Sequence, residues 1–240
     1  MISLERRDGR PLRIGHRGAA ALAPENTLES FRAAVEAGVD LVEFDVLELR
    51  SGELVVAHSR DEIVPETPTL DAALAFFSDE ASHTGLHLDL KTRGTEAGVA
   101  AALGRFDLLH RSFVSSFHFS TVRKLARIAP RIRIGITLPR AVLGITESGR
   151  GALFARGGLW LLRRVGPVAA PLALPVSRAT ALVLHHSLVG EAVVRRAHDR
   201  GAAVVTWTVD DQRDLARVDA VGVDAVVTND PRIFTSTLET

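Results

Sequence analysis

Apolar runs of four to eight residues recur along the chain, and amphipathic stretches separate them. The runs are rich in Val, Leu, Ile and Ala and are bounded by glycine or polar residues, which is typical of strands buried on both faces. The predicted strands are residues 12–16, 41–46, 86–90, 112–116, 132–138, 181–185, 202–209 and 225–228.

The intervening stretches carry apolar residues at helical spacing. They predict helices over residues 27–37, 68–77, 95–106, 120–128, 150–165, 191–200 and 211–219, and a short one after Pro231. Asn26 or Thr27 is the expected N-cap of the first helix, and Gly38 ends it.

Eight strands, each followed by a helix, predict an α/β fold of the (β/α)₈ TIM barrel type, with residues 1–240 as a single domain. A doubly wound open sheet is the alternative. No GxGxxG motif follows any predicted strand, so the commonest nucleotide-binding form of that sheet is excluded.

Charge and cysteine content narrow the function classes. The 29 basic and 29 acidic residues cancel, and no basic run occurs, which argues against a nucleic-acid partner. Cysteine is absent, so disulfide and thiolate chemistry are excluded. The first 13 residues are too charged for a secretory signal, which favours a cytoplasmic location.

Residues 151–175 are rich in Leu, Val and Ala and prompt a test for a membrane span. Arginine, glycine and proline interrupt them, and no apolar run reaches the roughly 20 residues that a span needs. A barrel-side helix followed by a loop is expected, and a surface helix that touches lipid or an acyl chain is the alternative.

The second predicted strand continues into a turn and a returning strand. A two-residue loop at Ser51-Gly52 would place Asp45 opposite His58. Glu43 and Asp45 are two residues apart and therefore share a face. Two buried carboxylates need a cation to neutralise them, and oxygen ligands favour Mg²⁺ or Ca²⁺ over zinc.

Polar residues gather at the carboxyl ends of the predicted strands, where barrel enzymes place their chemistry. They are His16, Arg17, Glu43, Asp45, Asp89, Lys91, His118, His185, His186, Trp207, Asp210, Asn229 and Asp230.

Simpler roles compete at several of these positions. Asp89 and Lys91 could form an internal ion pair, and His87 is expected to be a hydrogen-bonded core histidine. Trp207 could serve packing only. Asn229 and Asp230 are expected to shape the last loop and cap the final helix.

An ordered set of motifs resembles the glycerophosphodiester phosphodiesterases. The motifs are HRG at 16–18, PENTL at 24–28, EFDV at 43–46, VVAH ending at 58, LDLK at 88–91, SSF at 115–117, WTVD at 207–210 and GVDAVVTNDP at 222–231. The resemblance implies a (β/α)₈ barrel that binds a divalent cation, Mg²⁺ or Ca²⁺, and hydrolyses small glycerophosphodiesters to glycerol 3-phosphate and an alcohol.

The same resemblance implies roles for individual residues. The acid/base pair falls on His16 and His58, and the metal ligands fall on Glu43, Asp45 and Asp89. Three substrate-binding positions are implied: Arg17 at a phosphate-binding position, Lys91 at the lysine that follows the third metal ligand, and Trp207 at an aromatic near the pocket wall. One histidine would activate water or the glycerol 2-hydroxyl, and the other would protonate the leaving alcohol.

Three departures from the family pattern stand out. Asp89 replaces the usual glutamate, and Ser59 replaces the aspartate that usually follows the second histidine, so that Asp61 is the expected substitute. Only residues 60–67 stand where the family inserts a small subdomain. This short insertion and the apolar residues 151–175 motivate an alternative function, a lysophospholipase D-like activity on acylated substrates. A non-catalytic phosphate-binding barrel is the weaker alternative.

Overall fold

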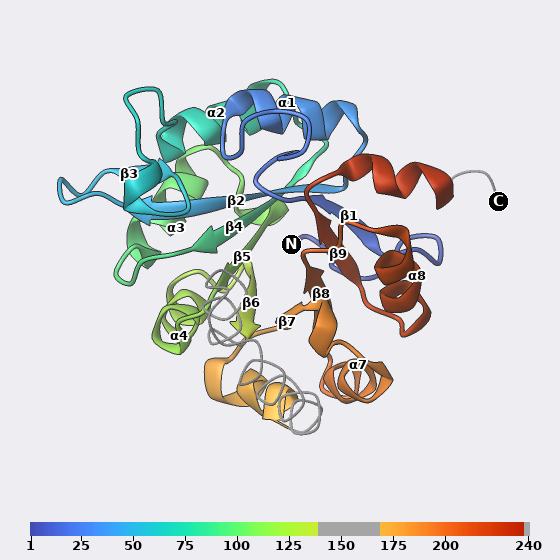
Figure 1. Cartoon of the computed structure of the whole chain (residues 1–240). Coiled ribbons are helices and arrows are strands. Elements are labelled where there is room, and N and C mark those ends of the chain that lie inside the picture. The colour runs from blue at the N-terminus through green and yellow to red at the C-terminus, as the bar shows by residue number, and fades with distance from the viewer. Residues whose placement is uncertain (139–168, 238–240) are drawn as a thin grey trace, which may run out of the picture.

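The computed structural model describes residues 1–138 and 169–237. Strands form a ring at the centre, and helices lie around it (Figure 1). The strands are β1 (Leu12–Gly15), β2 (Leu41–Glu48), β3 (Leu54–Val56), β4 (Gly85–Leu90), β5 (Ser112–Ser116), β6 (Arg133–Leu138), β7 (Ala181–His185), β8 (Ala203–Trp207) and β9 (Ala225–Thr228).

Most of the helices fall where the apolar spacing predicts them, but residues 169–177 are helical where a loop was expected. The α-helices are α1 (Leu28–Glu36), α2 (Leu70–Asp79), α3 (Glu96–Arg105), α4 (Phe119–Ile128), α7 (Glu191–His198) and α8 (Gln212–Ala220), and residues 169–177 are also helical. Short 3₁₀ helices are η1 (Arg60–Glu62), η2 (Leu109–Arg111), η3 (His186–Leu188) and η4 (Pro231–Thr237). The helix predicted over residues 150–165 lies outside the described residues.

The strand order closes the sheet into a barrel. Neighbours follow the order β1-β9-β8-β7-β6-β5-β4-β2, and an additional β1–β2 pairing joins the two ends. Each of these pairings is parallel, and β3 adds an antiparallel strand to β2. The predicted (β/α)₈ TIM barrel is therefore confirmed, and the open-sheet alternative is excluded by closure.

Side chains alternate between the barrel interior and the layer under the helices. Ile14, Phe113, Val183 and Val205 belong to the cluster that fills the lower interior. A larger cluster, which includes Phe31, Phe44 and Phe77, packs between the strands and the helices. The apolar interior ends before the carboxyl ends of the strands, so polar side chains can occupy the upper layer.

The β2–β3 hairpin has a different register from the one predicted. Val46 pairs with Val56, so Asp45 is not opposite His58. Leu49 accepts a hydrogen bond from Gly52 N, and Gly52 has a φ of +89°, which makes a three-residue loop with glycine in the left-handed region. The strand ends at Val56, and the chain then bends so that the His58 side chain still reaches Asp45.

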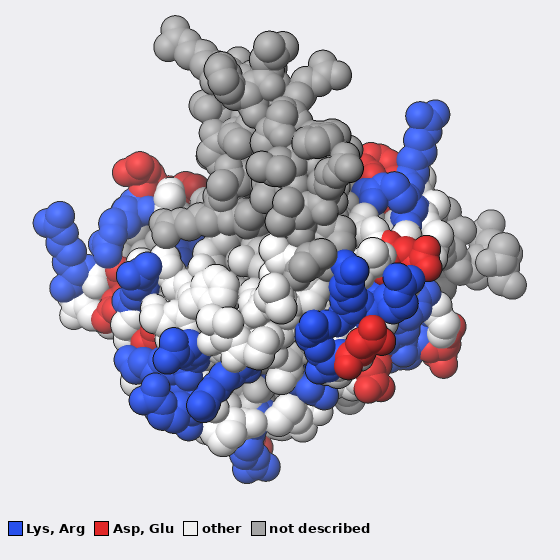
Figure 2. All heavy atoms as spheres, turned by 90° about the horizontal axis from the view of Figure 1, so that it is seen from below, with Lys and Arg blue, Asp and Glu red and all other residues white. Residues whose placement is uncertain are grey.

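The described part of the chain contains no helix that is long and apolar enough to cross a membrane. Most of residues 151–175 lies outside it. Within it, an apolar groove of about 390 Å³ lies between α4, residues 169–177 and α7. Viewed from the side of these helices, an uncharged area lies between two groups of basic side chains (Figure 2). Leu172 and Val176, which line the groove, are 52% and 60% exposed.

Gly18 holds the turn between β1 and α1 in a conformation that other residues rarely adopt. Its φ is +88°, and an added Cβ would lie 2.6 Å from the carbonyl carbon of Ser30. We expect Gly18→Ala to lower the free energy of unfolding by about 2 kcal/mol or more, because left-handed strain adds to this clash.

Gly52→Ala is the matched control for this prediction. Gly52 has a similar φ of +89°, but the nearest atom to an added Cβ is 3.9 Å away. Urea denaturation should therefore show a larger loss for Gly18→Ala than for Gly52→Ala. Equal losses would show that close packing at the first turn is unimportant.

Candidate active site at the barrel mouth

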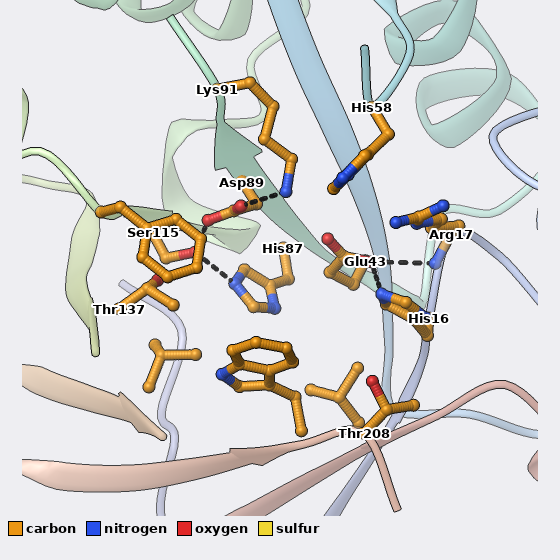
Figure 3. A pocket seen from close by; sticks show the side chains of 14 residues that line it. His16, Arg17, Glu43, His58, His87, Asp89, Lys91, Ser115, Thr137 and Thr208 are labelled. Carbon is orange, nitrogen blue, oxygen red and sulfur yellow. Dashed lines mark hydrogen bonds and ion pairs between the residues drawn. The ribbon is translucent and has the colours of Figure 1, made fainter. Parts of the chain in front are cut away.

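A cavity of about 210 Å³ opens at the carboxyl ends of the strands. The side chains around it point toward its centre (Figure 3). The lining residues are His16, Arg17, Glu43, His58, His87, Asp89, Lys91, Ser115, Phe117, Thr137, Val183, Trp207, Thr208 and Val227. This set contains every site residue predicted from the sequence except Asp45.

Asp45 is fully buried beside the cavity. Its Oδ2 accepts a hydrogen bond from Asn26 Nδ2 at 3.0 Å and lies 3.2 Å from His58 Nδ1. Arg17 Nε lies 3.1 Å from the same oxygen, and Lys91 Nζ lies 2.7 Å from Oδ1. Burial acts to raise the pKa of Asp45, but Lys91, His58 and Arg17 outweigh it and hold this pKa well below its ordinary value. The ionised carboxylate of Asp45 therefore contacts several cavity residues at once.

Lys91 bridges two carboxylates on neighbouring strands. Asp45 and Asp89 are directly paired in the β2–β4 register, and Lys91 Nζ lies 2.6 Å from Asp89 Oδ2. Burial opposes the charge of Lys91, but Asp45 and Asp89 outweigh it and raise the pKa of the ammonium above its ordinary value. The ion pair between Asp89 and Lys91 that the sequence suggested is confirmed.

Glu43 is only 4% exposed, although it lines the cavity. Its Oε2 accepts a hydrogen bond from the backbone N of Arg17 at 2.8 Å and lies 3.9 Å from His16 Nε2. Burial, and next the negative charge of Asp45, raise the pKa of Glu43 well above its ordinary value. A cation beside Glu43 would offset both effects.

His16 follows β1, and two hydrogen bonds in sequence hold its ring. They run through Asn229, which follows β9, to Asp210, which follows β8. Its Nδ1 lies 2.6 Å from Asn229 Oδ1, and Asn229 Nδ2 donates to Asp210 Oδ2 at 2.7 Å. The amide orientation makes Asn229 Oδ1 the acceptor, so Nδ1 of His16 carries the hydrogen and Nε2 keeps its lone pair. Burial lowers the pKa of His16 below its ordinary value, which favours this neutral ring.

The expectation that Asn229 mainly shapes the last loop was therefore incomplete. We expect Asn229→Ala to lower kcat/KM by about 10- to 100-fold, as removal of an orienting partner commonly does. The hydrogen bond to Asn229 raises the pKa of His16, so its loss should move the acid limb of the kcat/KM–pH profile to lower pH. An unchanged profile in a folded variant would assign Asn229 a structural role only.

Asn26 was expected as a possible helix cap, but Thr27 caps α1. Thr27 Oγ1 accepts from Ser30 N, and the Ser30 side chain accepts from Thr27 N. Asn26 instead has a φ of +59° and clamps Asp45 twice, because Asp45 N also donates to Asn26 Oδ1 at 3.1 Å. Asn26 therefore positions Asp45.

Arg17 also adopts a left-handed backbone, with a φ of +49°. Its Nη1 donates to Glu25 Oε1 at 2.7 Å while Nε faces Asp45. The neighbouring Gly15 and Gly18 make this tight turn, since a Cβ on either would meet backbone atoms. Strain of this kind at a cavity wall is typical of functional sites.

His58 is oriented by Asp45 rather than by Asp61, the substitute suggested from the sequence. Asp61 lies exposed in η1, whereas His58 Nδ1 faces the Asp45 carboxylate. A carboxylate only accepts hydrogen bonds, so Nδ1 of His58 is the protonated nitrogen.

His87 is a hydrogen-bonded core histidine, as predicted, but it also lines the cavity. Its Nε2 lies 2.9 Å from Ser115 Oγ, and Ser115 Oγ donates to Asp89 Oδ1 at 2.5 Å. Burial lowers the pKa of His87 to about 4. The remaining histidines near the strand ends, His118, His185 and His186, do not line the cavity.

No three His, Asp or Glu side chains of residues 1–138 and 169–237 converge as a ready-made metal cage. Lys91 stands between Asp45 and Asp89. The donor chemistry nevertheless fits a hard divalent cation, because Glu43 and Asp45 present carboxylates from one face of β2. Glu43 also lines the cavity, and its buried carboxylate faces the negative charge of Asp45, which a cation would offset.

A parallel barrel with its polar residues at the strand ends is an enzyme architecture. The model of the glycerophosphoryl diester phosphodiesterase family matches residues 16–73 and 68–233, which include every residue of the cavity. The chain belongs to this family and is a phosphoric diester hydrolase. Members of the family generally depend on a divalent cation.

Two relatives that this chain matches over most of their length support this assignment, and a solved structure shares the fold. The glycerophosphodiester phosphodiesterase of Caldanaerobacter subterraneus subsp. tengcongensis is 26% identical over 255 residues, which cover 91% of this chain and 93% of the relative. The Arabidopsis thaliana enzyme GDPD4 is 27% identical over 267 residues, covering 95% and 74%. An Oleispira antarctica phosphodiesterase, solved with the product sn-glycerol-3-phosphate, matches with a TM-score of 0.73 at 23% identity and covers 96% of this chain and 98% of that one.

Proposed function

We propose that this chain, acting as a single domain, hydrolyses glycerophosphodiesters to glycerol 3-phosphate and an alcohol in the cavity at the barrel mouth. The observation that carries the proposal is the orientation of two histidines in one cavity. His16 and His58 each use Nδ1 to bind an oxygen acceptor, which leaves both Nε2 atoms for proton transfer. The names of these two relatives support the substrate class.

His16 acts as the general base. It is neutral, and its Nε2 lone pair can accept a proton from the nucleophile, either water or the 2-hydroxyl of the glycerol group. The hydrogen bonds through Asn229 fix the ring so that the base does not need to reorient during the reaction.

His58 acts as the general acid. Its Nδ1–H remains bound to Asp45, so that a protonated ring is paired with an ionised carboxylate. Its Nε2 can then transfer a proton to the departing alkoxide. The two rings exchange these roles in the second step if the 2-hydroxyl is the nucleophile.

Glu43 and Asp45, with Asp89 as a third ligand, would hold the divalent cation, Mg²⁺ or Ca²⁺. When bound, such an ion neutralises charge on the phosphoryl oxygens. Arg17 and Lys91 contribute two further fixed positive charges at the same wall, and both are largely withdrawn from solvent. The protein therefore supplies preorganised charge where the phosphate must sit.

A panel of glycerophosphodiesters assayed with each divalent ion tests the proposal. We expect release of glycerol 3-phosphate and the free alcohol, identified by ³¹P NMR and an enzymatic alcohol assay. Release of free glycerol and a phosphorylated head group would show that the other ester bond is cleaved, and would overturn the proposal.

A lysophospholipase D-like activity is the second candidate, and the apolar groove supports it. The groove touches Leu138 and Leu184 at the ends of β6 and β7, and Phe119 at the start of α4. An acyl chain could lie there while the phosphate occupies the cavity. Choline release from lysophosphatidylcholine that exceeds release from glycerophosphocholine would favour this activity.

A further inference from the structure

Arg13 is a buried cation without a counterion in the described part of the chain. Leu12 and Ile14 point into the barrel, so Arg13, which stands between them on β1, points outward into the helix layer. The residue is 8% exposed, and its Nη2 is buried without a hydrogen-bond partner. An arginine stays protonated at neutral pH, so a positive charge is left uncompensated away from water.

The ring of Phe234 in η4 replaces only part of the lost hydration. Its centroid lies 5.7 Å from Arg13 Cζ. Burial, and next the charge of Arg10, lower the pKa of Arg13 below its ordinary value, although Asp40 acts to raise it. A ring face attracts a cation less strongly than an anion that accepts its hydrogen bonds. The surroundings of Arg13 therefore favour a negatively charged partner.

Two neighbouring carboxylates are already engaged by other cations. Asp40 Oδ2 accepts from Arg10 Nη1 and from the backbone N of Arg13, each at 2.8 Å. Asp219 Oδ1 accepts from Arg6 Nη2 at 2.6 Å. Among the described residues, neither carboxylate forms an ion pair with the Arg13 guanidinium. The missing counterion is therefore expected from outside the chain.

A cavity of about 270 Å³ borders Arg13 beside α8, on the outer side of β1 (Figure 1). It shares no lining residue with the cavity at the barrel mouth. One wall is the turn at Asp8 and Gly9, whose φ angles are +51° and +77°. Arg7 and Arg10 exchange two backbone hydrogen bonds across this turn, at 2.9 and 3.0 Å. Two positive φ angles and a closed pair of hydrogen bonds are typical of a tight hairpin turn, so this wall is preformed.

The lining distinguishes between classes of anion. The planar guanidinium of Arg13 matches a carboxylate, which can accept two parallel hydrogen bonds from it. Leu215 and Phe234 add apolar surface, which suits a short hydrocarbon substituent. Asp8 and Asp219 line the same cavity, and they repel a doubly charged ion such as phosphate more than a monoanion.

We propose that Arg13 is the centre of a binding site for small organic monocarboxylates, separate from the catalytic cavity. The carboxylate pairs with the guanidinium, and the hydrocarbon part lies against Leu215 and Phe234. The bound anion supplies the counter-charge that the described residues do not provide. This site goes beyond the proposed hydrolysis of glycerophosphodiesters and does not depend on it.

Titration with sodium propionate, at constant ionic strength held with sodium chloride, tests the site. The Arg13 Nε resonance in ¹H–¹⁵N spectra, identified by its absence in Arg13→Lys, should move along a saturating curve. The Arg105 Nε resonance is the control, since Arg105 is exposed and paired with Asp71. Inorganic phosphate should bind more weakly than propionate. A shift of Arg13 that does not saturate, or tighter binding of phosphate, would overturn the proposal.

Asp8→Asn tests where the anion binds, because it removes one negative charge from the cavity wall. The dissociation constant of propionate should fall about two- to fivefold, as expected for one charge near the surface. Asp61→Asn, in the exposed η1, is the matched control and should bind propionate as wild type does. Equal affinity of wild type and Asp8→Asn would contradict the assigned location.

Urea unfolding provides a second test through Arg13→Met, which removes the uncompensated charge. Without propionate, its unfolding midpoint should be higher than that of wild type. Arg111→Met is the contrasting variant and should lower the midpoint, because Arg111 donates to the backbone oxygens of Phe77 at 2.8 Å and Ala81 at 3.1 Å. Propionate should raise the midpoint of wild type but not that of Arg13→Met. Equal stabilisation of both by propionate would overturn the site.

Discussion

Replacement of His16 or His58 by alanine is expected to lower kcat by about 10²- to 10⁴-fold, because each variant loses one proton transfer in the transition state. The kcat of the double variant should be only slightly lower than that of the slower single variant, because the two rings act in one reaction. Steady-state assays with glycerophosphocholine at saturating metal provide the measurement. Thermal unfolding should show that all three variants remain folded.

His83→Ala is the control for these variants, because His83 is exposed and lies away from the cavity. It should retain wild-type kcat. Rates close to wild type in both His16→Ala and His58→Ala would reject the assignment of the acid/base pair.

Removal of divalent cations is expected to abolish activity. Adding the ion back should restore activity in wild type but not in Glu43→Gln. Without an ion, Glu43 is a buried acid whose pKa is raised, so the glutamine variant should fold at least as well as the metal-free enzyme. An ion at 100 times its dissociation constant should stabilise wild type by about 2.7 kcal/mol. The same ion should leave the unfolding midpoint of Glu43→Gln nearly unchanged.

Glu53→Gln provides the matched substitution at an exposed position that directly follows the hairpin loop. It should respond to EDTA and to added Mg²⁺ or Ca²⁺ as wild type does. Full turnover by wild type after exhaustive chelation would contradict the proposed metal site, and so would equal stabilisation of Glu43→Gln by the ion.

The barrel could be predicted from the sequence because its strands are buried on both faces. A buried parallel strand needs an apolar run, and such a run is visible without any partner. Predicted and observed strand ends, such as 112–116 against Ser112–Ser116, therefore agree closely. The predicted hairpin register was wrong. The observed register depends on the left-handed conformation of Gly52, which lengthens the loop by one residue.

The cavity lining was largely predictable, whereas the residues that orient it were not. Position at a strand end identified His16 and Lys91, since parallel strands end at one rim. Asn26 and Asn229 act through contacts between distant loops, and their local sequence reads as a helix cap and a turn. Both lie in motifs that the family resemblance includes, which was the available signal for a role in the site.

The division of labour between the two histidines is tested most directly by a change of leaving group. Glycerophospho-p-nitrophenol releases p-nitrophenolate, which needs little protonation near neutral pH. The account predicts that His58→Ala, which lacks the general acid, recovers most of its lost kcat/KM on this substrate, whereas His16→Ala does not. Equal losses of both variants on p-nitrophenyl and choline substrates would contradict it.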